Sequence, residues 1–309
     1  MTSTALYEEM VDALNAIHGA HAGRRAVHTN GVLLAGSFTA TPEAARLSRA
    51  AHLRGEPVRI TARFSNGGGD PAAPDGKPDG RGLAVKFYLP DGSTTDIVAL
   101  TLPVFFVRTP EDFLEFTRAR RPDPETGKPD MEKLGAFVEA HPEALPAIQI
   151  GLAMKAPDSY ACQRYWAIHA FRLVNSDGES RAVRYRLEPE AGIAEIESDE
   201  AKGRAPDYLR AGILEQLPAA FTLHAQLAED GDPEDDPTAA WPDERETVEL
   251  GRLELTGPET GRETGDDVLV FDPTRVTDGI ELSGDRVLAA RSHAYAVSVE
   301  RRSGVRREA

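Results

Sequence analysis

Apolar residues are spaced for a helix at each end of the chain. Over residues 3–20 they recur at intervals of three and four, which is the pattern of one apolar helix face. These residues are Leu6, Met10, Leu14 and Ile17. Residues 285–302 contain no proline or glycine and predict a long carboxyl-terminal helix.

Four shorter helical segments are expected between these two. Each has a helical pattern of apolar residues or a recognisable start, such as a Thr-Pro pair followed by acidic residues. They are residues 42–55 with Thr41 as the N-cap, a helix that begins after Thr109, residues 131–155 with a break at His141, and residues 199–218.

Alternation of apolar and polar residues predicts strands in the interior of the chain. In Val58–Ser65 every second residue is apolar, so the other face of this strand meets solvent or a polar site. Turns at residues 90–92 and 176–178 join neighbouring runs into hairpins. Further strands are expected over 31–41, 81–89, 94–100, 165–175, 180–189, 220–228, 247–256 and 267–271. Together the elements predict an α+β fold with an antiparallel sheet or barrel, and residues 1–309 are taken as one domain.

Composition and charge exclude several classes of function. The 35 basic and 51 acidic residues give a net charge of -16, which repels nucleic acid and anionic membranes. The amino terminus carries Glu8 and Glu9 where a secretory signal needs apolar residues, and no apolar run reaches about 18 residues. Cys162 is the single cysteine and cannot form an internal disulfide, so we expect a cytoplasmic protein.

The common short sequence motifs do not indicate a function for this protein. The glycine-rich run 66–70 lacks the Lys-Ser/Thr pair of a phosphate-binding loop, and His18 and His21 lack further metal ligands nearby. No GxSxG motif of a serine hydrolase occurs. Cys162 is interpreted as an inert thiol.

The carboxyl-terminal helix offers two interpretations. Arg291, Tyr295 and Arg302 are spaced by four and seven residues and share one helix face. They are either ordinary surface residues or a functional set. In the second case the guanidinium of Arg291 favours the ionised form of Tyr295, and a tyrosinate can ligate ferric haem iron.

The amino-terminal half contains residues that would complete such a site. Cationic Arg25 and Arg63 would suit the two haem propionates. His28 could take a proton from a peroxide and return it to the departing oxygen. As a lone residue, a histidine such as His28 is more often structural.

Several segments, in order along the chain, resemble the haem catalase superfamily. RAVHTNGVLLAGSFTAT at 25–41 is similar to the family's distal-histidine segment. ITARFSNGGG at 60–69 and the stretch from DGRGLAVKFY to VRTPEDF at 79–113 follow. HAFRLVNSDG, DDPTAAWP and the stretch from VFDPTRV to YAVSVERR at 270–302 complete the match. The resemblance covers residues 20–302.

This resemblance implies a catalase-like antiparallel β-barrel that binds haem b. His28 would be the acid–base residue, with Ser65 bonded to its ring, and Tyr295 would ligate the iron with Arg291 bonded to its oxygen. Arg25, Arg63 and Arg302 match the propionate-binding arginines. Val27 and Phe113 match apolar residues of the distal pocket and its approach.

Two departures from the family pattern modify the expected activity. Leu100 occupies the position of the family's distal asparagine, so a hydrogen-bond donor to peroxide is missing. The chain is shorter than typical catalases, so we expect it to lack their wrapping arm and carboxyl-terminal domain and to form a homodimer. No NADPH motif is found.

We therefore expect a haem-dependent peroxidase with weak catalase activity. It would reduce hydrogen peroxide or organic hydroperoxides with an organic electron donor. The alternatives are a haem enzyme that rearranges fatty-acid hydroperoxides, a non-catalytic haem carrier, and a haem-free barrel that binds an apolar ligand.

Overall fold

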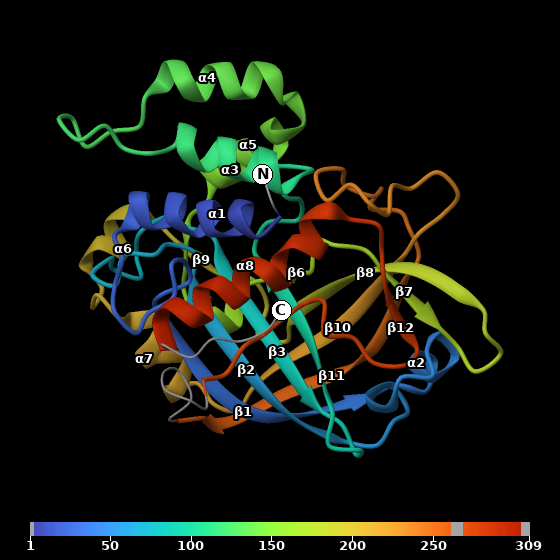
Figure 1. Cartoon of the computed structure of the whole chain (residues 1–309). Coiled ribbons are helices and arrows are strands. Elements are labelled where there is room, and N and C mark those ends of the chain that lie inside the picture. The colour runs from blue at the N-terminus through green and yellow to red at the C-terminus, as the bar shows by residue number, and fades with distance from the viewer. Residues whose placement is uncertain (1–2, 261–267, 304–309) are drawn as a thin grey trace.

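The alternating segments of the sequence form one antiparallel sheet that closes on itself (Figure 1). The strands are β1 Gly31–Ala40, β2 Val58–Asn66, β3 Arg81–Tyr88, β4 Thr94–Leu100, β6 Tyr165–Trp166, β7 Phe171–Val174, β8 Ser180–Pro189, β10 Ala219–Leu227, β11 Thr247–Pro258 and β12 Ile280–Leu282. The order β10-β11-β1-β2-β3-β4-β6-β8 is completed by pairing of β8 with β10, while β7 and β12 extend the sheet beyond β8. This confirms the predicted antiparallel barrel.

Helices cover the barrel in this computed structural model, which describes residues 3–260 and 268–303. They are α1 Ser3–His18, α2 Pro42–Leu47, α3 Pro110–Ala119, α4 Met131–Ala140, α5 Leu145–Ala153, α6 Ser198–Gly203, α7 Tyr208–Glu215 and α8 Arg286–Ser303. Short 3-10 turns are η1 Ala51–Leu53, η2 Pro142–Ala144 and η3 Tyr160–Cys162, and β5 Ala156–Pro157 pairs with β9 Glu195–Ile196. Both terminal helices and the caps Thr41 and Thr109 agree with the sequence prediction.

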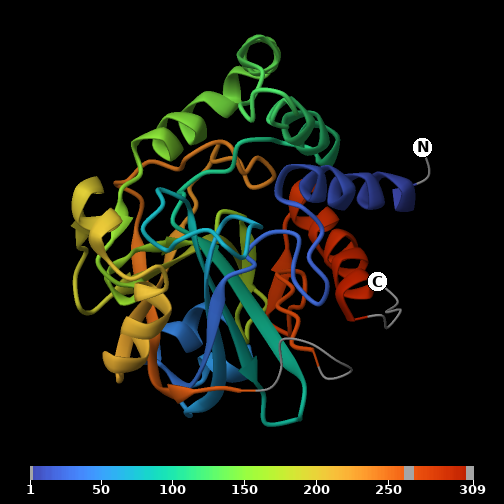
Figure 2. The ribbon, with the colours of Figure 1, turned by 90° about the vertical axis from the view of Figure 1, so that its left-hand side faces the viewer.

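Two terminal helices, far apart in sequence, lie side by side. In Figures 1 and 2 α1 and α8 run beside the barrel, and α3, α4 and α5 form a layer next to them. The Tyr7 and His293 rings stack with centroids 4.9 Å apart, and Arg301 forms a 2.6 Å ion pair with Asp12. Within the described ranges, we find no helix with the length and apolar character that crossing a membrane requires.

Predicted segments differ from the structure where tertiary contacts override the local pattern. The helix expected to continue to Gly55 ends at Leu47, because Ser48 is extended and its hydroxyl donates a 2.7 Å hydrogen bond to the carbonyl of Gly279. The single strand expected over 165–175 is two strands, β6 and β7, with His169 bonded to Asp285 between them.

The prediction of a strand over 267–271 was also wrong. Residue 267 lies outside the described residues, and residues 268–271 have no strand structure. Leu269 and Phe271 instead pack against Leu33, and the carbonyl of Leu269 accepts a 3.0 Å hydrogen bond from Arg25. These residues form a loop held by side chains rather than by strand pairing.

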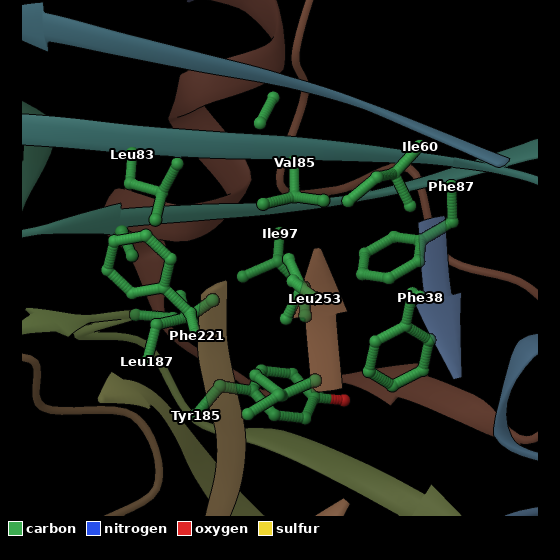
Figure 3. Close-up of a cluster of buried hydrophobic side chains, with 14 of the residues drawn as sticks. Phe38, Ile60, Leu83, Val85, Phe87, Ile97, Tyr185, Leu187, Phe221 and Leu253 are labelled. Atoms are coloured by element: carbon green, nitrogen blue, oxygen red, sulfur yellow. The ribbon is translucent and has the colours of Figure 1, made fainter. Parts of the chain in front are cut away.

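The interior of the barrel is apolar, as Figure 3 shows for side chains from several strands that point toward one another. Among them are Phe38, Ile60, Val85 and Leu253, which are almost fully buried. Burying a large apolar side chain contributes about 1.5–3 kcal/mol. The interior is therefore a packed core, and any polar chemistry has to lie on the outside of the barrel wall.

Candidate active site

The polar face of β2 lies on the outside of the barrel wall. Thr61, Arg63 and Ser65 are buried there, so the face predicted to meet solvent or a polar site is covered by protein. Ser65 pairs with Gly82 of β3, and Gly82 pairs with Leu100 of β4. Because directly paired residues of antiparallel strands point to the same side, Ser65 and Leu100 flank Gly82 on one face.

The ring of His28 lies over this row of residues. Its Nδ1 atom is 3.0 Å from the hydroxyl oxygen of Ser65. A Cβ atom at Gly82 would lie 2.9 Å from that oxygen and 3.1 Å from the His28 ring. Glycine at position 82 therefore leaves the space in which the imidazole is held.

The surroundings of His28 keep its imidazole neutral. Burial is the main cause that lowers its pKa from 6.5 to about 3, and the positive charges of Arg63, Arg291 and Arg25 lower it further. A neutral imidazole keeps one ring nitrogen as a proton acceptor. His28 is therefore in the protonation state that a general base requires at neutral pH.

Helix α8 carries the second part of the site. The carboxylate of Asp285 accepts hydrogen bonds from the backbone N–H groups of Val287 and Leu288 and so fixes the start of the helix. One turn later, Arg291 donates two hydrogen bonds to the phenol oxygen of Tyr295, at 2.9 Å from Nε and 2.6 Å from Nη2. Hydrogen bonds from a guanidinium are charge-assisted, so the two donors hold the phenol oxygen firmly in place.

Arg291 connects the two parts of the site. It bonds Tyr295, and its charge also acts on the pKa of His28. In the fold, α8 packs mainly on α1 and α3 rather than on the strands of the barrel. The amino-terminal histidine and the carboxyl-terminal tyrosine predicted from sequence are therefore brought to one region of the molecule.

The other predicted residues lie in the segment before His28 and on β2, α3 and α8. Arg63 is buried on β2, and Arg25 is half-buried next to the 268–271 loop. Val27 is half-buried immediately before His28. Phe113 of α3 packs with Phe106 and Phe105 at ring distances of 5.7 and 6.3 Å. Half-buried Arg302 lies two turns beyond Tyr295 on α8.

One buried pair beside the site was not predicted. His169 lies with Nδ1 2.6 Å from a carboxylate oxygen of Asp285, and its Nε2 has no hydrogen-bond partner among the described residues. Burial lowers the pKa of His169, the hydrogen bond to Asp285 raises it, and the charge of Arg291 lowers it. The only signal in the sequence was the place of His169 at the start of the HAFRLVNSDG segment.

The donor set favours an organic cofactor that brings its own metal over a bare metal ion. A bare ion is usually held by several His, Cys, Asp or Glu ligands, and the described residues contain no group of three or more that could do so. A single tyrosine oxygen can serve as the one protein ligand of a haem iron. Arg25 and Arg63 lie close enough to His28 for their charges to lower its pKa, and such cations fit an anionic cofactor.

Comparisons with known proteins agree with this site. The sequence model of the family described as Catalase matches residues 7–309. A catalase-related peroxidase of Mycolicibacterium paratuberculosis is 43% identical over 306 residues, which cover 98% of this chain and 96% of the relative. A catalase-related peroxidase of Synechococcus elongatus is 36% identical over 299 residues, which cover 96% of this chain and 88% of the relative.

Solved structures show the same fold. A fungal catalase superposes with a TM-score of 0.81 at 26% identity and covers 91% of this chain. Catalase A from Saccharomyces cerevisiae gives a TM-score of 0.80 at 24% identity and covers 90%. The matched part spans 60% and 61% of those two chains. Since the family model covers nearly the whole sequence and a relative of similar length is 43% identical, the chain belongs to the catalase family.

Proposed function

We propose that this protein is a haem-dependent peroxidase that reduces hydrogen peroxide or organic hydroperoxides with electrons from an organic donor. The observation that carries the proposal is the double role of Arg291, which bonds the oxygen of Tyr295 and acts on the pKa of His28. Two relatives matched over nearly their whole length are named catalase-related peroxidases.

The cofactor proposed is haem b. Members of the catalase family use haem, and the phenol oxygen of Tyr295 with its two guanidinium donors fits the role of iron ligand. Arg25, Arg63 and Arg302 would bind the two propionates. When bound, the haem group would supply the two electrons that reductive cleavage of the peroxide O–O bond requires, and the organic donor would replace them.

His28 would move the proton in this reaction. A neutral imidazole takes a proton from one peroxide oxygen and returns it to the departing oxygen, which leaves as water or an alcohol. The low pKa of His28 keeps it in the accepting form, and the contact with Ser65 fixes the orientation of the ring. The low pKa and the contact with Ser65 both require that the ring of His28 is held in one position.

Residues around His28 would select the substrate. Val27 and Phe113 would present apolar surface that favours small neutral peroxides over charged reductants. Leu100 has no hydrogen-bond donor, so a second peroxide molecule cannot be oriented there by a side-chain bond from position 100. We therefore propose weak dismutation of hydrogen peroxide alongside peroxidase activity.

The proposed function is tested by measuring oxygen release and dye oxidation with the haem-loaded protein and hydrogen peroxide. Dye oxidation with slow oxygen release is expected, whereas rapid oxygen release without dye oxidation would contradict the preference for peroxidase chemistry. Isomerised products from a lipid hydroperoxide would instead identify a rearranging enzyme.

A matched pair of histidine substitutions separates the enzyme from a haem carrier. His28→Ala should lower the peroxide rate by several orders of magnitude. His224→Ala, at a half-buried histidine on β10, should leave the rate within twofold of the wild type. A His28→Ala variant with the wild-type rate would identify a carrier.

The organisation of the protein belongs to the same proposal. We propose that residues 1–309 act as one haem domain in the cytoplasm and that two copies form a homodimer. Light scattering of the purified protein measures the assembly, with twice the 33.4 kDa chain mass expected. A mass equal to one chain would exclude the dimer.

A further inference from the structure

The backbone of His28 has a conformation that a residue with a side chain seldom adopts. Its φ angle is +54°, and it is the only non-glycine with a positive φ in the described part of the chain. Such a conformation persists when the surrounding structure holds it. The contacts on both sides of His28 therefore decide where its imidazole points.

The glycine run Gly67–Gly69 supplies the first of these contacts. The N–H of His28 donates to the carbonyl of Gly67, and the N–H of Thr29 donates to the carbonyl of Gly68, both at 3.2 Å. A Cβ atom at Gly69 would lie 2.1 Å from the carbonyl oxygen of Ala26. The two segments thus touch through their backbones, and the glycines provide no side chain to fix them.

The side chain of Thr29 links the two backbone segments. Its hydroxyl lies 2.7 Å from the carbonyl oxygen of Arg25 and 3.0 Å from that of Gly69, so it can donate to either. Thr29 is only 7% exposed. One buried side chain therefore ties the residues before His28 to the glycine run behind it.

The glycine run is held from its other side as well. The N–H of Gly68 donates a 2.7 Å hydrogen bond to the carboxylate of Asp79, and the N–H of Gly67 donates to the carbonyl of Gly80 at 2.7 Å. Because the run is anchored to the two residues immediately before β3, the hydroxyl of Thr29 connects His28 to a segment that the barrel holds in place.

We propose that Thr29 is a positioning residue that holds His28 against Ser65. Thr29 does not touch the reacting atoms, and it acts by preventing the 25–29 backbone from relaxing away from Gly69. Relaxation would turn the Cα–Cβ bond of His28 and separate its ring from the hydroxyl of Ser65, now 3.0 Å away. The role in catalysis rests on the proposed function of His28.

Three variants test the role of the hydroxyl. Thr29→Val removes it at nearly constant volume, and Thr29→Ser retains it. Thr95→Val is the matched control, because Thr95 is also buried and its hydroxyl donates a 2.9 Å hydrogen bond to the carbonyl of Arg275, far from His28 in sequence. Loss of a buried hydroxyl is thus common to Thr29→Val and Thr95→Val.

Hydrogen exchange of the haem-loaded protein, read by mass spectrometry, measures the positioning directly. In Thr29→Val the amides of residues 28 and 29 should exchange at least tenfold faster than in the wild type, with no such change in Thr29→Ser or Thr95→Val. Unchanged exchange in Thr29→Val would overturn the proposal. If Thr29→Val does not fold, Thr29→Ala is used in its place. If neither variant folds, amide exchange in Thr29→Ser that is faster than in the wild type would overturn the proposal.

Kinetics provide the second readout. The second-order rate constant with peroxide should fall at least tenfold in Thr29→Val and recover in Thr29→Ser, while the KM for a dye donor stays within twofold. A rate that follows the control Thr95→Val would contradict the positioning role. If the wild type has no peroxidase activity, the proposed function fails, but the exchange result still decides whether Thr29 holds His28.

Discussion

The low pKa of His28 makes a quantitative prediction for the pH dependence of the reaction with peroxide. A histidine with the ordinary pKa of 6.5 would be about 97% protonated at pH 5, and a rate that needs the neutral ring would fall about 30-fold between pH 8 and pH 5. With a pKa of about 3, only about 1% of His28 is protonated at pH 5. The rate constant should therefore be constant over this range.

Stopped-flow mixing of the haem-loaded protein with excess hydrogen peroxide measures this rate constant at each pH. Circular dichroism at pH 5 checks that the fold is intact, and His28→Gln gives the pH dependence without the ring. The reasoning would be refuted if the rate constant of the folded wild type fell tenfold or more from pH 7 to pH 5 while that of His28→Gln did not. Such a result would mean that burial and the three arginines do not lower the pKa of His28 as described.

Three further predictions concern neighbouring residues. Leu100→Asn adds an amide donor beside Gly82 and should raise oxygen release from hydrogen peroxide several-fold in an oxygen-electrode assay; no increase would contradict the proposal that Leu100 limits catalase activity. Gly82→Ala places a Cβ 3.1 Å from the ring of His28 and should lower the peroxide rate at least tenfold in the folded variant, whereas a wild-type rate would show that the ring has room to move. Burial lowers the pKa of His52 to about 4, so the unfolded chain binds its proton more readily, and the contribution of His52 to stability should be full above pH 6.5 and fall by roughly 3 kcal/mol as the pH drops to 4. Urea unfolding at pH 7.5 and 4.5 should show a smaller loss of stability in His52→Leu than in the wild type. An equal loss in both would show that His52 does not cause the pH dependence.

Local patterns in the sequence predicted most of the fold. Alternation in Val58–Ser65 gave the strand and its two faces, and Thr41 and Thr109 are helix caps as predicted. The pattern could not show that Ser48 bonds Gly279, which ends α2 early. Such contacts between residues distant in sequence leave no periodic signal.

The candidate site was predicted largely by resemblance and only partly by chemistry. The spacing of Arg291 and Tyr295 predicted that they share one helix face, and the family resemblance implied the hydrogen bond that joins them in the structure. The register that places Gly82 between Ser65 and Leu100 depends on strand pairing and could not be read from one sequence. His169 was missed because a lone histidine in a strand-like segment gives no sign of a partner such as Asp285, which lies 116 residues away in sequence.

The proposed site requires that the oxygen of Tyr295 ligates the haem iron, and resonance Raman and visible spectra of the haem-loaded protein measure this ligation. The wild type should show vibrations of an iron-bound phenolate, and Tyr295→Phe should lose them and shift its visible absorption. Identical spectra for the wild type and Tyr295→Phe would mean that another group holds the iron, and the assignment of the site would be wrong.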